Sequence, residues 1–172
     1  MGAWFDGFDA GFHPANGQHL FVRTGGRRDG PPLLLLHGFP QTHAIWHRVA
    51  TQLADRFFLV MPDLRGYGAS SKPAGGGEHA DYSKRAMARD VAELMRTLGH
   101  TTFAVCGHDR GGRVAHRLAL DHPDAVSRLC LLDIAPTLDM YAATDMGFAK
   151  AYYHWFHPVS YTHLTLPTIC SV

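Results

Sequence analysis

The sequence predicts an α/β fold, with a doubly wound, mostly parallel sheet that has helices on both faces. Short apolar runs alternate along the chain with longer segments of helical periodicity, which is the pattern of parallel strands joined by helices. The runs are continuously apolar, as expected for strands that are buried on both faces. Composition agrees, because a chain of 172 residues with 46% hydrophobic and 18% charged residues can form the core of one domain.

Each element follows from a local signal. Residues 8–12 and 19–23 are expected to pair as antiparallel strands around the Asn16-Gly17 turn. The other predicted strands are the apolar runs at residues 33–37, 57–61, 103–106 and 129–134. The predicted helices cover residues 42–54, 81–98 and 110–121. Gly99 is expected to cap the C-terminus of the second helix.

Three aspartates stand at or just after the ends of predicted strands, namely Asp63, Asp109 and Asp133. Active sites in such sheets lie outside the carboxyl ends of the strands. Asp109 is the centre of residues 107–111 (Gly-His-Asp-Arg-Gly), a strand-turn-helix pattern that holds its central side chain above the sheet. A carboxylate at this turn suits displacement at a saturated carbon through a covalent alkyl ester.

Composition also narrows the function classes. The formal net charge of +1 gives no nucleic-acid footprint. The 13 histidines are scattered without metal-ligand spacing, so neither a metal nor a cofactor is expected. Cys106 and Cys130 lie in apolar runs and are expected to be buried free thiols. The sequence shows no secretory signal and no apolar run near the roughly 18 residues of a membrane span, so a cytoplasmic location is expected.

Five strings together carry a resemblance to a known family. They are residues 37–42 (His-Gly-Phe-Pro-Gln-Thr), 63–68 (Asp-Leu-Arg-Gly-Tyr-Gly), 107–113 (Gly-His-Asp-Arg-Gly-Gly-Arg), 132–137 (Leu-Asp-Ile-Ala-Pro-Thr) and 152–155 (Tyr-Tyr-His-Trp). With them the chain resembles the α/β-hydrolase superfamily, and most closely its haloacetate dehalogenases, including the fluoroacetate dehalogenases. The first two strings are shared across the superfamily, whereas the third and the fifth are more specific.

The resemblance implies roles for two residues of the elbow and for several residues outside it. Asp109 would be the nucleophile, and Asp133 would orient the catalytic histidine. The alternatives for Asp133 are a simple turn cap or replacement in that role by Asp63. Arg110 and Arg113 are three apart on one helix face, where planar guanidinium groups suit bidentate binding of a substrate carboxylate. The backbone N–H groups of Phe39 and Arg110 would form the oxyanion hole.

The same resemblance assigns the halide site to His154 and Trp155, with Tyr141 as a possible pocket-lining residue. The structural alternative is an amphipathic helix that buries its aromatic side chains. In relatives the general-base histidine belongs to a segment beyond Pro158. The ester on Asp109 is therefore expected to form and then persist in this chain.

The expected organisation is an N-terminal part of the core domain at residues 1–136 and the start of a helical cap at 137–158. Residues 159–172 are expected to be a non-native tail, because the first ten of them resemble the translation of a sequencing-library adapter.

The expected function is hydrolytic dehalogenation of a small anionic 2-haloacid, such as haloacetate or fluoroacetate, to glycolate and halide. The alternatives are an epoxide hydrolase, which usually carries tryptophan where this chain has Arg110, and a non-catalytic binding protein of the same fold. Relatives commonly form homodimers, and neither a nucleic-acid nor a membrane partner is expected.

Overall fold

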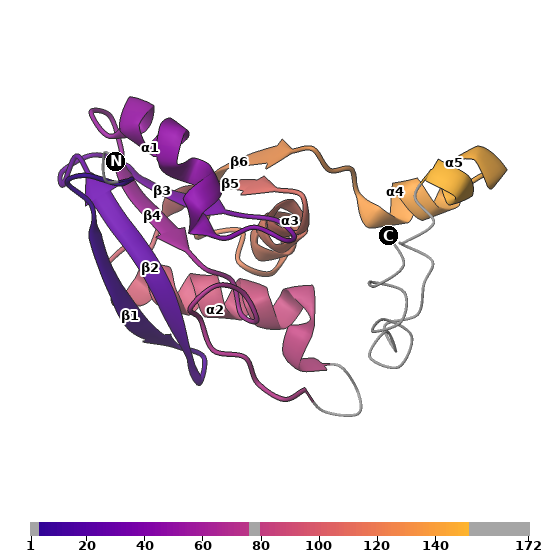
Figure 1. Cartoon of the computed structure of the whole chain (residues 1–172), viewed down its shortest axis with the longest axis horizontal. Helices are drawn as coiled ribbons and strands as arrows, with labels where there is room; N and C mark the ends of the chain where they lie inside the picture. The colour runs from indigo at the N-terminus through magenta and orange to yellow at the C-terminus, as the bar shows by residue number, and fades with distance from the viewer. Residues whose placement is uncertain (1–3, 76–79, 152–172) are drawn as a thin grey trace. The chain divides into compact units, whose positions relative to one another are not determined.

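The computed structural model describes residues 4–75 and 80–151 of the chain (Figure 1). The chain divides into two compact units, Met1–Ile134 and Ala135–Val172. All strands of the described residues lie in the first unit and form one sheet, in the order β1-β2-β4-β3-β5-β6. Their bounds are Asp9–Ala15 (β1), Gln18–Gly26 (β2), Pro32–Leu36 (β3), Phe58–Pro62 (β4), Phe103–His108 (β5) and Val126–Leu132 (β6).

The sheet is mixed but mostly parallel. β1 and β2 form an antiparallel hairpin in which Ala15 pairs with Gln18, and β2 continues antiparallel onto β4. Strands β4, β3, β5 and β6 run parallel to one another. The hairpin turn is Asn16-Gly17, where both residues have the positive φ that such a turn requires. The predicted fold class is therefore confirmed.

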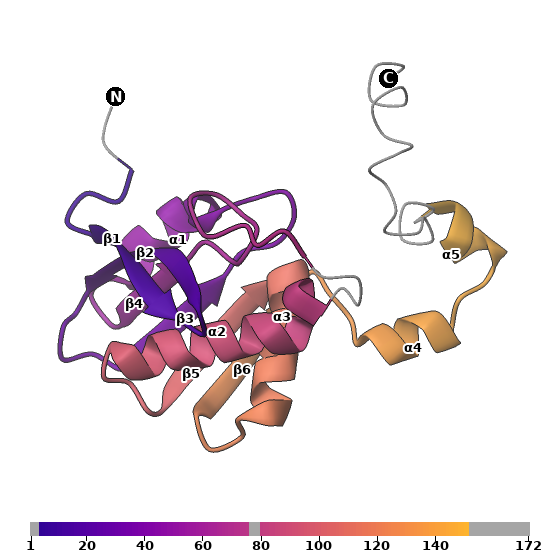
Figure 2. The ribbon, with the colours of Figure 1, turned by 90° about the horizontal axis from the view of Figure 1, so that it is seen from below.

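Helices cover both faces of the sheet (Figures 1 and 2). The 3₁₀-helix η1 (His43–Trp46) leads into α1 (His47–Leu53) on one face. A 3₁₀ turn η2 (Ala80–Tyr82), α2 (Lys84–Thr97) and α3 (Arg110–Asp121) follow, with α2 and α3 on the other face. The helix α2 begins three residues later than predicted, because Ser83 caps it by accepting a hydrogen bond from the backbone N–H of Ala86.

The alternation of side chains along β3 explains why its run is apolar throughout. Leu34 and Leu36 belong to the hydrophobic cluster that α2 and α3 cover, which includes Val91 and Leu118. Leu35, between them, belongs to a second cluster under α1. Successive side chains of a strand point to opposite faces, so a central strand between two helical layers must be apolar at every position.

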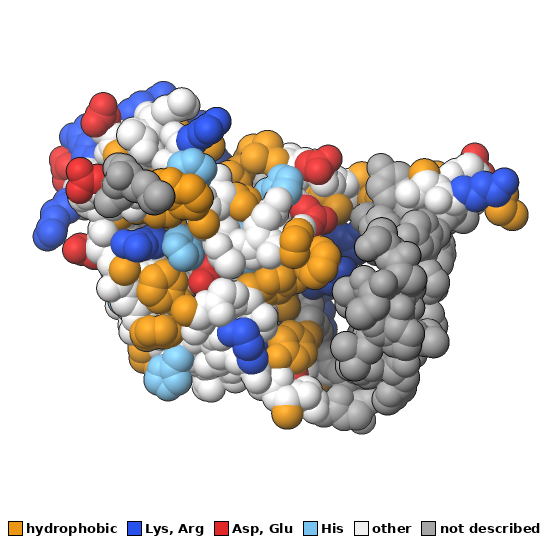
Figure 3. Space-filling view, viewed as in Figure 1, with side chains coloured by type: hydrophobic (Ala, Val, Ile, Leu, Met, Phe, Trp, Pro, Cys, Tyr) orange, Lys and Arg blue, Asp and Glu red, His pale blue; other side chains and the backbone are white. Residues whose placement is uncertain are grey.

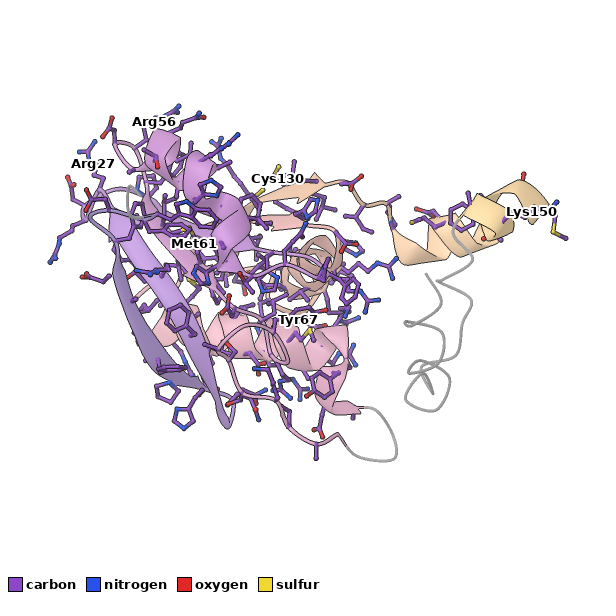
Figure 4. All side chains as sticks on the ribbon, viewed as in Figure 1. Arg27, Arg56, Met61, Tyr67, Cys130 and Lys150 are labelled. Carbon is purple, nitrogen blue, oxygen red and sulfur yellow. The ribbon has the colours of Figure 1, made fainter. Side chains whose placement is uncertain are left out.

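Some apolar side chains remain at the surface. Figure 3 shows hydrophobic side chains over β1 and β2, where exposed Phe12 packs edge-on against Phe21 with ring centroids 5.5 Å apart. Cys130 on β6 is exposed (Figure 4), so the prediction that it is buried was wrong. The reason is its position: within the described residues β6 is the last strand of the sheet, with no strand beyond it.

The described part of the second unit consists of α4 (Thr137–Ala142) and α5 (Met146–Ala151). That residues 137–158 begin a cap stays a prediction. Residues 152–172, which include the expected tail, lie outside the described residues. Among the described helices none is both long and apolar enough to cross a membrane.

Candidate active site

Asp109 lies in the tight turn between β5 and α3, with a φ of +47°. Positive φ is uncommon for any residue other than glycine, and it marks local backbone strain. Two backbone hydrogen bonds hold the turn. The N–H of Asp109 donates to the carbonyl of Leu132 at 3.0 Å, and its carbonyl accepts from the N–H of Arg113 at 3.2 Å. The strained residue is thus tied to the end of β6 and to the first turn of α3.

Gly111 permits the close approach of α3 to the sheet on which this turn depends. A Cβ atom at Gly111 would lie 2.7 Å from the carbonyl carbon of Leu36 at the end of β3. No side chain fits at that distance, so the elbow pattern needs glycine at this position. The elbow predicted from residues 107–111 is therefore present in the fold.

The loop after β3 reaches directly to the Asp109 side chain. The backbone N–H of Phe39 donates to Oδ2 of Asp109 at 2.9 Å, whereas no described residue donates to Oδ1. A Cβ atom at Gly38 would lie 2.6 Å from the Cβ of Asp109 and 2.7 Å from its Oδ2, so glycine is required there too. Of the two predicted backbone donors, only Phe39 bonds to this carboxylate within the described residues, and Arg110 does not.

His37 supports that loop from beneath. The ring is fully buried, and its Nε2 accepts from the N–H of Leu64 at 2.9 Å, which leaves the proton on Nδ1 to donate to the Gly38 carbonyl at 2.9 Å. Burial lowers the pKa of His37 below its ordinary value. A neutral histidine thus joins the loop after β3 to the loop after β4.

Arg110 and Arg113 rise from the first turn of α3, beside Asp109. Arg110 is exposed, and its Cζ lies 5.2 Å from the centroid of the Phe39 ring, a cation–π contact. Arg113 is partly buried one turn further on. A helix N-terminus attracts anions through its free N–H groups, so two guanidinium groups here form a region suited to a carboxylate.

Two residues beside this region were not singled out from the sequence. Lys84 begins α2, and the charges of Arg110, Arg113 and Asp109 act on it. Burial, together with the two guanidinium groups, lowers the pKa of Lys84 to about 8, although Asp109 opposes the shift. No local signal in the sequence marks this lysine.

Tyr67, on the loop after β4 (Figure 4), is the second such residue. Its ring meets that of His37 edge-on at 5.1 Å. Burial raises the pKa of the Tyr67 hydroxyl, and the charge and hydrogen bonding of Arg110 oppose that rise. The Gly-Tyr-Gly string around it was informative only as part of the family resemblance.

The two aspartates considered for orienting the catalytic histidine, Asp133 and Asp63, have different surroundings in the structure. The carboxylate of Asp63 is buried and accepts from the ring Nδ1 of His43 at 2.7 Å and from the N–H of Ala69 at 3.1 Å. Burial alone would raise the pKa of Asp63, but these hydrogen bonds outweigh it and the pKa lies below its ordinary value. Asp133 has an 86% exposed side chain, 3.7 Å from Nε2 of His108. Asp133 is therefore the acid whose carboxylate is open to a further partner.

The predicted halide-site residues His154 and Trp155 lie outside the described residues, and so does the side chain of Tyr141. Among described side chains, no group of three or more His, Cys, Asp or Glu residues could hold a metal ion.

The sequence of the chain can be compared with those of known proteins. Residues 31–164 match the family model for the alpha/beta hydrolase fold. A fluoroacetate dehalogenase of a Burkholderia species is 53% identical over 152 residues, which cover 88% of this chain and 49% of that protein. A soluble epoxide hydrolase of Corynebacterium sp. (strain C12) is 46% identical over 123 residues, which cover 72% of this chain and 41% of that protein.

Solved structures agree with these matches. A putative alpha/beta hydrolase from Nostoc sp. PCC 7120 superposes with a TM-score of 0.84 at 54% identity, covering 88% of this chain and 52% of that one. The chain spans about half the length, or less, of the curated relatives it matches. Sequence and fold lead to the same assignment: this chain belongs to the α/β-hydrolase fold family.

Proposed function

We propose that the protein hydrolyses the carbon–halogen bond of a small 2-haloacid, with Asp109 as the nucleophile. One observation carries the proposal. Asp109 stands in the strained turn with Oδ2 held by the N–H of Phe39, while Oδ1 has no hydrogen-bond partner among the described residues. One oxygen is thus fixed and the other is free to attack.

In the first step Oδ1 of Asp109 forms a bond to the α-carbon of the haloacid. The carbon–halogen bond breaks, and its electron pair leaves with the halide. Arg110 and Arg113 bind the substrate carboxylate, which places the α-carbon over Asp109. Displacement requires this alignment, and positioning of a reactant beside its nucleophile removes much of the entropic barrier.

In the second step water attacks the carboxyl carbon of the Asp109 ester. The electrons of the carbonyl bond move onto Oδ2, the atom that already accepts from the N–H of Phe39 at 2.9 Å. A donor preorganised on a developing oxyanion typically contributes about 3–4 kcal/mol. The tetrahedral intermediate then expels glycolate and restores the carboxylate. The proton of the water passes to a base, for which the resemblance implies a later histidine oriented by Asp133.

The comparisons support this choice of substrate class without deciding it. The Burkholderia relative, at 53% identity, is named a fluoroacetate dehalogenase. Two guanidinium groups beside the nucleophile suit an anionic substrate.

Epoxide hydrolysis is the second candidate, because the Corynebacterium relative at 46% identity is named a soluble epoxide hydrolase. The same aspartate would open the epoxide ring and form a hydroxyalkyl ester. Arg110 and Arg113 could bind the carboxylate of a haloacid, whereas a neutral epoxide has no group of that kind. This difference makes the haloacid the better supported substrate.

The test uses the chain of 172 residues. It is incubated separately with fluoroacetate and with styrene oxide, then analysed by peptide mass mapping and a fluoride electrode. We expect fluoride release, and a carboxymethyl group on the peptide that contains Asp109. Asp109→Asn should abolish both, and Asp124→Asn, at an exposed aspartate after α3, should change neither. A styrene oxide adduct on Asp109 without fluoride release would favour the epoxide hydrolase. If neither fluoride nor an adduct on Asp109 forms, both candidate functions are rejected.

A further inference from the structure

A row of three side chains crosses the parallel part of the sheet and ends in two cysteines. Leu35 of β3 pairs in register with Cys106 of β5, and Cys106 pairs in register with Cys130 of β6. Residues that pair in register on neighbouring strands point to the same face of a sheet. Leu35 and Cys106 both pack in the hydrophobic cluster under α1, so the side chain of Cys130 lies on that face as well.

The row becomes more accessible from the centre of the sheet toward its edge. Leu35 is 1% exposed, Cys106 is partly buried, and Cys130 is exposed on β6 (Figure 4). Both cysteines are free thiols. A reagent in solution therefore meets Cys130 before it meets Cys106.

The spacing of the two cysteines suits a bond between them. Neighbouring strands lie about 4.8 Å apart, and a disulfide spans Cα atoms that are about 4.4–6.8 Å apart. The register is continuous from Ala104, which pairs with Arg128, to His108, which pairs with Leu132, so no bulge displaces one cysteine from the other. The strands therefore hold the two Cα atoms at a distance that a disulfide can bridge.

The surroundings of the two thiols give them different reactivity. A thiolate, and not a thiol, attacks a disulfide, so an accessible cysteine reacts before a buried one. Burial, and then the neighbouring Cys130 thiol, raise the pKa of Cys106. Cys106 therefore stays protonated at neutral pH, which agrees with the order of attack that the exposure of the two residues indicates.

We propose that Cys106 and Cys130 form a covalent modification site that takes small disulfides. Cys130 captures one half of the small disulfide, and Cys106 then releases it by closing a cross-strand disulfide between β5 and β6. The inference is independent of the proposed function, because it concerns the pairing of two strands and not the chemistry of Asp109.

The reaction has two exchange steps. In the first, the Cys130 thiolate attacks one sulfur of the small disulfide, whose S–S bond breaks, and the electron pair leaves with the other sulfur as a thiolate. In the second, Cys106 loses its proton to solvent and attacks Sγ of Cys130, which expels the captured half as a second thiolate. The two cysteines together lose two electrons, and the small disulfide gains them and becomes two thiols.

The new bond would lie directly below the nucleophile turn. His108 pairs with Leu132 two register steps beyond the cysteines, and the N–H of Asp109 donates to the carbonyl of Leu132 at 3.0 Å. Within the described residues, β6 has β5 as its one neighbouring strand. The disulfide would therefore fix the strand that supports this turn to the strand that leads into it.

The experiment follows the reaction of the folded chain with oxidised glutathione. All variants carry Cys170→Ser, because the third cysteine lies outside the described residues. One variant keeps both remaining cysteines, and two matched variants add Cys106→Ser or Cys130→Ser. After incubation, free thiols are alkylated with iodoacetamide, and the products are read by intact mass and peptide mapping. Circular dichroism shows that each variant is folded, and the same reactions in urea give the reactivity of the unfolded chain.

We expect the chain with both cysteines to lose two hydrogen atoms, to retain no glutathione and to yield a peptide linked through Cys106 and Cys130. Cys106→Ser should keep one glutathione on Cys130, because the resolving thiol is missing. Cys130→Ser should react at least about tenfold more slowly, because the thiol that remains is partly buried and protonated. In urea the two single-cysteine variants should react at similar rates.

Three results would overturn the proposal. Glutathione that persists on Cys130 beside an intact Cys106 would show that the second thiol does not resolve the adduct. A disulfide between two chains through Cys130 would show that the partner is not Cys106. Equal rates for Cys106→Ser and Cys130→Ser in the folded chain would show that the fold does not set the order of attack.

Discussion

The backbone N–H of Phe39 donates to Oδ2 of Asp109 at 2.9 Å, across two loops that are distant in the sequence. The bond joins the end of β3 to the end of β5, two neighbouring parallel strands. It also makes the two carboxylate oxygens of Asp109 unequal, since only Oδ2 has a donor among the described residues. The proposed mechanism uses this inequality, because one oxygen attacks and the other receives the charge of the intermediate.

Gly38→Ala should test the hydrogen bond between the N–H of Phe39 and Oδ2 of Asp109. A Cβ at Gly38 would lie 2.6 Å from the Cβ of Asp109, so either the carboxylate or the loop must move. We expect the rate of ester formation from fluoroacetate to fall about 100-fold, in line with the loss of one preorganised donor and of alignment. Gly11→Ala is the matched control, because its Cβ would meet only Nε2 of His13, at 3.8 Å. Equal rates in the two variants would contradict the role of this contact.

If Arg110 and Arg113 bind the substrate carboxylate, replacing Arg113 should weaken substrate binding, whereas replacing Arg117 on the same helix should not. Arg113→Gln should raise the half-saturating concentration of fluoroacetate about tenfold or more, because a charge-assisted contact to the substrate carboxylate is lost. Arg117→Gln should have little effect, since Arg117 pairs with Asp121 one turn later. The half-saturating concentration is measured from the dependence of initial fluoride release on substrate. An unchanged half-saturating concentration in Arg113→Gln would show that Arg113 does not bind the substrate carboxylate.

The fold could be predicted because its signals are local. The apolar run that became β3 and the glycine-flanked turn at Asp109 are both readable within a few residues. The exposure of Cys130 was not predictable in this way, because burial of a strand depends on which strand lies beside it.

The candidate site was only partly predictable for the same reason. The backbone donor Phe39 was expected from the resemblance, and its loop does reach Asp109. No motif in the sequence indicates a chemical role for Lys84 or Tyr67, although the charge of Arg110 acts on both side chains in the folded chain. Side chains that converge through tertiary packing leave no periodicity or spacing in the sequence.

A buried ion pair holds the loop that carries Tyr67. Arg65 donates to both carboxylate oxygens of Asp90, at 2.8 and 2.6 Å, and both side chains are at most 4% exposed. Asp90→Asn leaves the guanidinium buried without its counter-ion, which should lower the free energy of unfolding by about 3–5 kcal/mol. Urea denaturation measures the change. Asp29→Asn breaks the exposed pair with Arg27 and should give no measurable loss, because solvent screens that pair.

His37 predicts how stability depends on pH. Burial lowers its pKa in the folded chain, whereas in the unfolded chain it titrates near its ordinary value of about 6.5. As the pH falls below about 6.5, the unfolded chain takes up a proton that the folded chain refuses, so the free energy of unfolding decreases. The slope is at most about 1.4 kcal/mol per pH unit for one group, and it ends at the lowered pKa.

The measurement is urea unfolding at several pH values between 7.5 and 5.5 for His37→Gln and for His19→Gln, whose imidazole is exposed. A glutamine at position 37 can still accept from Leu64 and donate to the Gly38 carbonyl, but it cannot be protonated. The acid slope should therefore be shallower in His37→Gln and unchanged in His19→Gln. His100, whose pKa is also lowered by burial, accounts for part of the slope that remains. If His37→Gln keeps the full slope, the neutral histidine is not what ties the Phe39 loop to the loop after β4.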